Sequence, residues 1–155
     1  MKLCQKLDRV LHHLAPVQTF AQSALLLTLR LLYGGQFYMT GRGKLMNLDQ
    51  TTSFFTDLHI PAPGFHAVLV GSTEMIGGVL LVLGFATRCA AVPLAISMVV
   101  AYLTAHRADA FKSVDDFTSQ APYQFLLACL LLLTFGPGRV ALDAWLKRYF
   151  AKRFA

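Results

Sequence analysis

Four apolar stretches, separated by short polar segments, dominate the pattern of hydrophobic and polar positions along the chain. An α-helix rises about 1.5 Å per residue, so about 20 apolar residues cross the hydrocarbon core of a bilayer. Helices are expected because an isolated strand in lipid leaves its backbone polar groups without hydrogen-bond partners. The pattern therefore predicts four membrane-spanning helices, at residues 19–40, 65–85, 90–105 and 122–135.

The two ends of the chain differ from these stretches, because apolar residues repeat there at helical spacing among basic ones. The apolar sets are Leu3, Leu7, Val10, Leu11 and Leu14, and Leu142, Trp145, Leu146, Tyr149 and Phe150. Basic amphipathic helices lie on a membrane surface, and docking of a partner protein is the alternative. We therefore expect one all-α membrane domain over residues 1–155, a four-transmembrane-helix bundle with an interfacial helix at each terminus.

Composition supports a lipid environment, and the basic residues predict the orientation. Hydrophobic residues make up 55% of the chain and charged residues 14%, whereas a typical soluble domain is about 25% charged. Nine basic residues fall on the side of the termini: Lys2, Lys6, Arg9, Arg88, Arg139, Lys147, Arg148, Lys152 and Arg153. Four fall on the other side: Arg42, Lys44, Arg107 and Lys112. The positive-inside rule then predicts cytoplasmic termini and explains the net charge of +6 without a nucleic-acid partner.

Two ionisable residues interrupt the apolar spans, Arg30 in the first and Glu74 in the second. Inserting an arginine at the centre of a membrane helix costs about 2.5–3.5 kcal/mol, so such a residue should face the bundle and find a partner. Each residue lies about eleven positions from the cytoplasmic end of its predicted span, which corresponds to a depth of about 16 Å. The spans run antiparallel, so we predict a buried Arg30–Glu74 pair near the midplane.

Small residues surround this predicted pair. Gly34 and Gly41 follow Arg30, and Gly71 and Gly78 flank Glu74, so the two helices are expected to pack closely. A pair of this kind either locks two helices together or forms part of a ligand or proton site, and both alternatives stay open. Lys44 and Arg88 follow the first two spans, where basic side chains commonly extend toward the membrane surface.

Candidate metal and catalytic groups are sparse. His59, His66 and His106 all fall on the outer side in this topology and are weak candidates for a metal site, because they lack a tight ligand spacing. The three cysteines, Cys4, Cys89 and Cys129, are scattered and predict neither a disulfide framework nor a metal site. No haem, flavin, Fe–S or soluble-enzyme motif is present. Whether the chain is an enzyme is open, and at most we expect a cofactor-touching subunit of an oxidoreductase.

Three segments resemble the DoxX family. The segment LRLLYGGQFYMTGRGKL is similar to the family's opening, with Arg30, Gly34, Phe37, Gly41 and Lys44 in register. The segments STEMIGGVLLVLGFATR and GPGRVALD are similar to its second span and its closing segment. The resemblance implies a four-helix bacterial inner-membrane protein linked to redox and sulfur metabolism, to oxidative stress, or to operons that handle metal-binding peptides. The segments TEMIGG, LGFATRCAA and FGPG look closest to the last type.

Three functions are compatible with these residues. The first is a redox- or stress-linked membrane component, with Arg30 and Glu74 holding a quinone head group among Tyr33, Phe37 and Tyr102. The second is an anchor that assembles soluble partners on its basic ends. The third is a small transporter, which four helices would form as a homo-oligomer.

Overall fold

The computed structural model describes the backbone of residues 2–153 and the side chains of residues 18–151 and 153. All regular secondary structure in this part of the chain is helical, so the all-α prediction is confirmed. The helices are α1 (Lys2–Met46), α2 (Leu48–Asp57), α3 (Pro63–Leu83), α4 (Thr87–Leu103), α5 (Arg107–Ala110), α6 (Val114–Ser119), α7 (Ala121–Phe135) and α8 (Leu142–Arg153). Among the described residues, α3 is the one helix long and apolar enough to cross a membrane, while α4 and α7 are shorter apolar helices.

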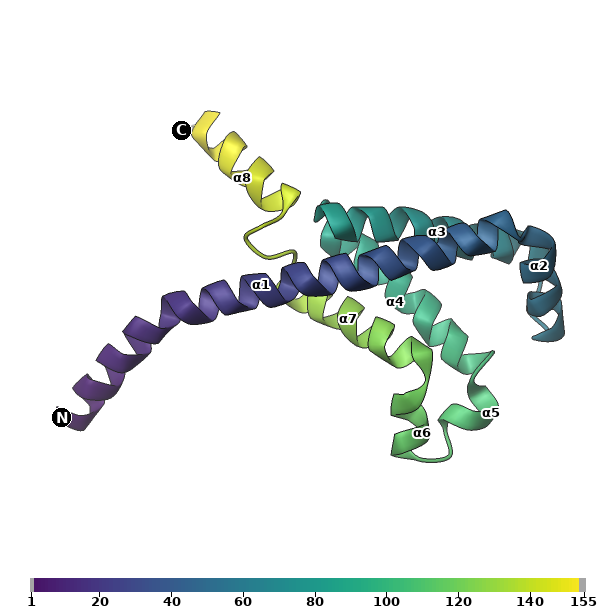
Figure 1. The fold of residues 1–155 in the computed structure, drawn as a ribbon, viewed down its shortest axis with the longest axis horizontal. Coiled ribbons are helices and arrows are strands. Elements are labelled where there is room, and N and C mark those ends of the chain that lie inside the picture. Colours follow the sequence, from purple (N-terminus) through teal and green to yellow (C-terminus); the bar gives the residue numbers. More distant parts are fainter. Residues whose placement is uncertain (1, 154–155) are drawn as a thin grey trace.

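Helix α1 is the longest element and packs along α3, while α4 packs against α7 and α2 folds back onto the start of α3 (Figure 1). Glycines make the α1–α3 contact close. A Cβ atom placed on Gly78 would lie 2.5 Å from the backbone nitrogen of Tyr38 and 2.6 Å from the carbonyl oxygen of Gly34. One placed on Gly41 would lie 2.6 Å from the carbonyl oxygen of Gly71. Backbone therefore meets backbone along this contact, as the four glycines predicted.

The buried core lies where α1, α3, α4 and α7 meet, and it contains Leu26, Phe37, Leu81, Ala90, Ala91, Leu94, Met98, Cys129 and Leu132. The outer surface of the same helices is also rich in large apolar side chains, such as Phe20, Leu25, Ile76, Ile96 and Leu130. In water, an exposed apolar surface of this extent would drive association or aggregation. In lipid, it is the surface that a bundle needs.

Two predicted boundaries were wrong. The first span and the N-terminal interfacial helix were predicted as separate elements, but the backbone of residues 2–46 forms one continuous helix of 45 residues. The side chains of its apolar face up to Leu14, together with Cys4, lie outside the described residues. Gly41 and Lys44 belong to this helix and not to a loop, because the sequence has no proline between Pro16 and Met46 that would end the helix earlier.

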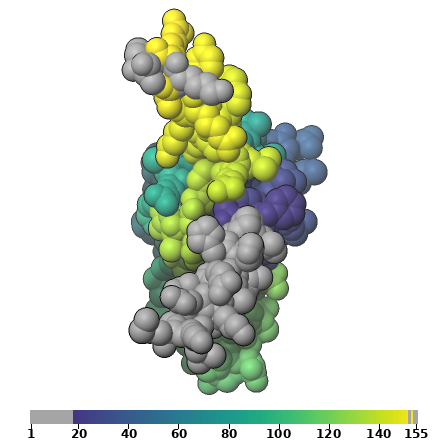
Figure 2. Space-filling view, turned by 90° about the vertical axis from the view of Figure 1, so that its left-hand side faces the viewer, coloured from purple at the N-terminus to yellow at the C-terminus, as the bar shows by residue number. Residues whose placement is uncertain are grey.

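Helix α8 stands away from the rest of the fold. Figures 1 and 2 show it projecting beyond the helices from the loop that follows α7. Its large side chains are exposed, including Trp145 and Tyr149, whose rings stack with centroids 5.6 Å apart. The prediction of a C-terminal helix is confirmed, with aromatic and basic residues exposed along it.

Candidate functional site

Arg30 is fully enclosed, with 2% of its surface exposed, and backbone carbonyls surround its guanidinium. Nε donates to Leu81 O at 2.8 Å and Nη2 donates to Val82 O at 2.9 Å. Nη1 donates to Pro137 O at 2.8 Å and to Val140 O at 2.7 Å. The last carbonyls of a helix have no partner within it and favour a nearby positive charge. Arg30 therefore caps the C-terminus of α3 and fastens the loop before α8 to it.

The predicted Arg30–Glu74 pair was wrong, and the register of the two helices explains why. The close contacts at Gly34–Gly78 and Gly41–Gly71 place Glu74 opposite the turn around residues 38–41 of α1. Arg30 lies opposite the end of α3, against Gly84 and the carbonyls of Leu81 and Val82. The depth estimate counted from residue 19 as the cytoplasmic end of the first span, but α1 begins at Lys2, so residue 19 does not mark an end of the helix that can be aligned with the end of α3.

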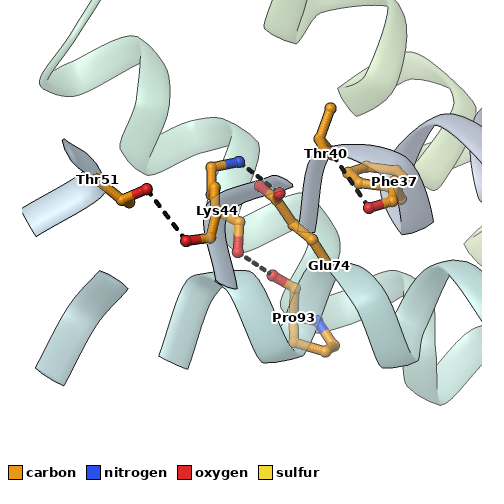
Figure 3. Close-up of polar contacts among 7 residues, drawn as sticks. Phe37, Thr40, Lys44, Thr51, Glu74 and Pro93 are labelled. Atoms are coloured by element: carbon orange, nitrogen blue, oxygen red, sulfur yellow. Dashed lines mark hydrogen bonds and ion pairs between the residues drawn. The ribbon is translucent and has the colours of Figure 1, made fainter. Parts of the chain in front are cut away.

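Glu74 is instead paired with Lys44. Lys44 Nζ donates to Glu74 Oε2, and Figure 3 shows the two side chains turned toward each other. The Glu74 side chain is 3% exposed and that of Lys44 is 29% exposed, so the carboxylate is buried and the ammonium lies nearer the surface of the fold. The hydroxyl of Thr51, at the start of α2, donates to the carbonyl of Lys44 at 3.2 Å. A buried carboxylate of this kind needs a charged partner, because an isolated charge in apolar surroundings is very costly.

A cavity of about 550 Å³ opens beside this ion pair. Residues of α1, α2, α3, α4 and the start of α7 line it, and most of them are apolar, such as Phe37, Phe55 and Met98. The polar lining includes Lys44, Glu74, Thr40, Thr73, Ser97, Thr104, His66 and His106. A largely apolar hollow of this size with a few polar groups is typical of a small-molecule site. It has room for a partly apolar ligand with one polar end.

The cavity brings together only some of the residues predicted from the sequence. Glu74, Lys44 and Phe37 line it, whereas Arg30, Arg88, Tyr33 and Tyr102 do not. The predicted cradle of Tyr33, Phe37 and Tyr102 around a head group was therefore wrong except for Phe37. The Tyr33 ring packs edge-on against Phe125 with centroids 5.5 Å apart.

The tyrosine on α4 has a structural role. The Tyr102 hydroxyl donates to Phe117 O at 2.7 Å, and the two rings stack with centroids 4.6 Å apart. These contacts hold the loop helix α6 against the end of α4. In the same loop, Lys112 Nζ donates to Asp109 Oδ1 at 2.7 Å, and this exposed hydrogen bond lowers the pKa of Asp109 and raises the pKa of Lys112.

The histidines do not assemble a metal centre among the described residues, where no group of three or more His, Cys, Asp or Glu side chains is placed to hold an ion. His66 and His106 line the cavity, but His59 does not. His106 Nδ1 lies 2.8 Å from Gln120 Oε1, and His66 Nδ1 lies 3.3 Å from Ala62 O. The weak hypothesis of a site shared by all three was therefore wrong.

Sequence reasoning missed the small polar residues of the cavity and the role of Lys44. No sequence motif distinguishes these residues from the other small residues of the apolar spans. They are Thr40, Thr73, Ser97 and Thr104. A signal did exist for Lys44. Gly34 and Gly41 are seven residues apart, as are Gly71 and Gly78, and matching them in antiparallel order places Glu74 opposite position 38, less than two helical turns before Lys44.

Comparison with known proteins adds the family. The DoxX family model matches residues 25–107. The chain is 39% identical over 130 residues to the "Uncharacterized membrane protein Rv3486" of Mycobacterium tuberculosis, covering 77% of this chain and 80% of that protein. It is 32% identical over 117 residues to the "Putative oxidoreductase CatD" of Bacillus subtilis, covering 76% of this chain and 83% of that protein.

A Haemophilus influenzae protein with no described function is 30% identical over 140 residues, covering 86% of this chain and 91% of that protein. No solved structure matches the chain. The matched segment contains both Arg30 and the Lys44–Glu74 pair. The chain therefore belongs to the DoxX family, whose membership implies a lipid bilayer around it.

Proposed function

We propose that this chain is a single membrane domain over residues 1–155 that crosses a bacterial inner membrane four times, with both termini cytoplasmic. Its spans would be parts of α1, α3, α4 and α7. Exposed apolar side chains on all four helices support this topology, since lipid is the solvent that such surfaces require. The excess of basic residues on the side of the termini supports the orientation.

Within this domain, we propose that the cavity beside the Lys44–Glu74 pair binds a small quinone-type molecule, as part of a redox- or stress-linked membrane system. One observation supports this most directly: a buried carboxylate and its lysine partner lie in the wall of an otherwise apolar cavity of about 550 Å³. The name of the Bacillus subtilis relative describes that protein as an oxidoreductase, which agrees with a redox link here.

The chemistry of the wall fits both forms of such a ligand. The Lys44 ammonium carries three N–H donors, so it is able to donate to a quinone carbonyl while still paired with Glu74. The Glu74 carboxylate accepts hydrogen bonds, as a quinol hydroxyl requires. The apolar lining from α3 and α4 would surround the ring and the start of its tail. The role proposed for this chain is to bind and orient the molecule.

A photoreactive short-chain quinone, added to the purified full-length protein in detergent, tests this proposal. Crosslinks mapped by mass spectrometry should fall on segments of α1, α3 and α4 that line the cavity, and an excess of unreactive short-chain quinone should suppress them. Ala101→Phe fills the cavity and should reduce labelling about tenfold. Val99→Phe, on the outer surface of the same helix, is the matched control. Equal labelling of both variants would show that the quinone binds elsewhere.

Anchoring of a soluble partner is the second candidate, and the exposed basic and aromatic residues of α8 favour it. Deleting residues 145–155 removes most of this helix but keeps Asp143, which hydrogen-bonds to the α3–α4 turn. If anchoring is the function, partner proteins recovered with the full chain should be lost from the truncated chain. Identical recovery would leave only the cavity-based function.

A further inference from the structure

A second cavity, of about 520 Å³, lies between the middle of α1 and the turn that joins α3 to α4, away from the ion pair. Residues of α1, the start of α4, the loop after α7 and the start of α8 line it. Three of its lining side chains are cationic: Arg88, Arg139 and Lys147. From this convergence we infer an anion site, which would take a phosphate-type group.

The one carboxylate in the lining belongs to Asp143, and the protein already uses both of its oxygens. Oδ1 accepts from the backbone N–H of Ala86 at 2.9 Å, and Oδ2 accepts from that of Thr87 at 3.4 Å. Asp143 therefore neutralises the N-terminus of α4. Three cations against one carboxylate leave a formal excess of two positive charges around the cavity.

The three cations come from different elements, so helical periodicity alone does not bring them together. Arg88 belongs to α4, Arg139 to the loop and Lys147 to α8. Placing like charges around one hollow costs repulsion, which a bound anion removes. Arg88 Nη2 donates to Thr134 O at 3.1 Å, and a guanidinium has five N–H donors. Arginine forks match phosphate oxygens well, and lysine adds a point charge.

The position of the loop is fixed from the opposite side. Arg30 holds the carbonyls of Pro137 and Val140, which belong to the same loop as Arg139. Four hydrogen bonds immobilise the guanidinium of Arg30, and two of them go to this loop. The loop therefore forms a rigid side of the second cavity. This anion site is independent of what the first cavity binds. The phosphate would come either from an anionic lipid head group or from a free ion in solution.

Cys89 gives a direct test, because it is exposed, free and part of the cavity lining. Cys129 is buried, so in a full-length Cys4→Ser protein Cys89 is the accessible thiol. The experiment compares how fast a negatively charged and an uncharged methanethiosulfonate modify Cys89 in phosphatidylcholine nanodiscs. The ratio of the two rates cancels any change in thiolate reactivity that both reagents share. We expect the anionic reagent to modify Cys89 about tenfold faster than the uncharged reagent does.

Arg139→Gln combined with Lys147→Gln should remove this preference. The matched control, Arg148→Gln combined with Arg153→Gln, removes the same charge from residues outside the lining and should keep it. Lys147→Gln alone changes one exposed side chain and should give an intermediate ratio. Loss of the preference in the control pair, or no preference in the starting protein, would overturn the proposal.

The source of the anion is distinguished with two additions. Phosphatidylglycerol in the nanodisc should slow the modification of Cys89 if a lipid head group occupies the cavity. Inorganic phosphate added to phosphatidylcholine nanodiscs should slow it if a free ion does. If neither addition protects Cys89 at any concentration tested, the cavity does not bind phosphate groups and the inference is wrong.

Discussion

Arg30 and Glu74 are two buried charges in one pair of helices, and each is stabilised differently. Backbone carbonyls surround Arg30, while Glu74 has a single charged partner in Lys44. Removing Lys44 leaves a carboxylate in apolar surroundings, whereas removing Glu74 leaves a partly exposed ammonium that reaches the surface more easily. The two substitutions should therefore differ in cost.

Double-mutant cycles separate these arrangements. Lys44→Met and Glu74→Gln should show a coupling energy of about 1–3 kcal/mol, because the side chains form one ion pair. Arg30→Lys and Glu74→Gln should be additive within about 0.5 kcal/mol, since no contact joins them. Unfolding in mixed micelles with increasing dodecyl sulfate, followed by circular dichroism, measures both cycles. Strong coupling between Arg30 and Glu74 would restore the pairing expected from sequence.

Burial of both charges could be predicted from the sequence, because an ionisable residue inside an apolar span has few other options. The partners of Arg30 could not, since backbone carbonyls leave no trace in the residue pattern. The acceptors Pro137 and Val140 lie in a loop whose fold depends on Gly136 and Gly138, both at a φ of +80°. Fold class followed from periodicity and composition alone.

At the level of helices, the α1–α3 contact depends on glycine. Gly78→Ala brings a methyl group within 2.5 Å of the Tyr38 backbone nitrogen, and the helix backbones have no flexible group that could yield. We expect a loss of about 2 kcal/mol in the free energy of unfolding. Gly35→Ala is the control, because nothing lies within 4 Å of its added Cβ, and alanine stabilises a helix by up to about 1 kcal/mol over glycine. A similar loss at both positions would point to helix geometry and not to packing.

Asp143 joins the start of α8 to the turn between α3 and α4. Its carboxylate accepts from Ala86 and Thr87, while its own N–H donates to Gly84 O at 3.1 Å. Asp143→Ala should cost about 1 kcal/mol, as loss of a helix N-cap does. It should also speed proteolysis within residues 137–142, which limited digestion in detergent measures. Unchanged cleavage there would show that the Arg30 hydrogen bonds and the backbone N–H of residue 143 hold the loop without the carboxylate.

For the whole molecule, the orientation of the chain in the membrane is testable with reporters at two points. A fluorescent-protein fusion at the C-terminus should fluoresce, and an alkaline phosphatase fusion at the same point should be inactive, because a cytoplasmic C-terminus is expected. Alkaline phosphatase inserted after residue 112, in the loop between α4 and α7, should be active. The opposite pattern at both points would invert the proposed topology.

The hydrogen bonds of Arg30 join a helix made early in synthesis to a loop made late. Two of its acceptors, Pro137 and Val140, are 107 and 110 residues further along the chain than Arg30 itself. When α1 first enters the membrane, those carbonyls have not yet been synthesised, so the guanidinium lacks these two hydrogen-bond acceptors. If synthesis stops after α7, two of the four acceptors of Arg30 are missing. The incompletely bonded guanidinium should then make the truncated chain a target for membrane proteases. Completion of the last loop is then the step that completes the burial of the first charge.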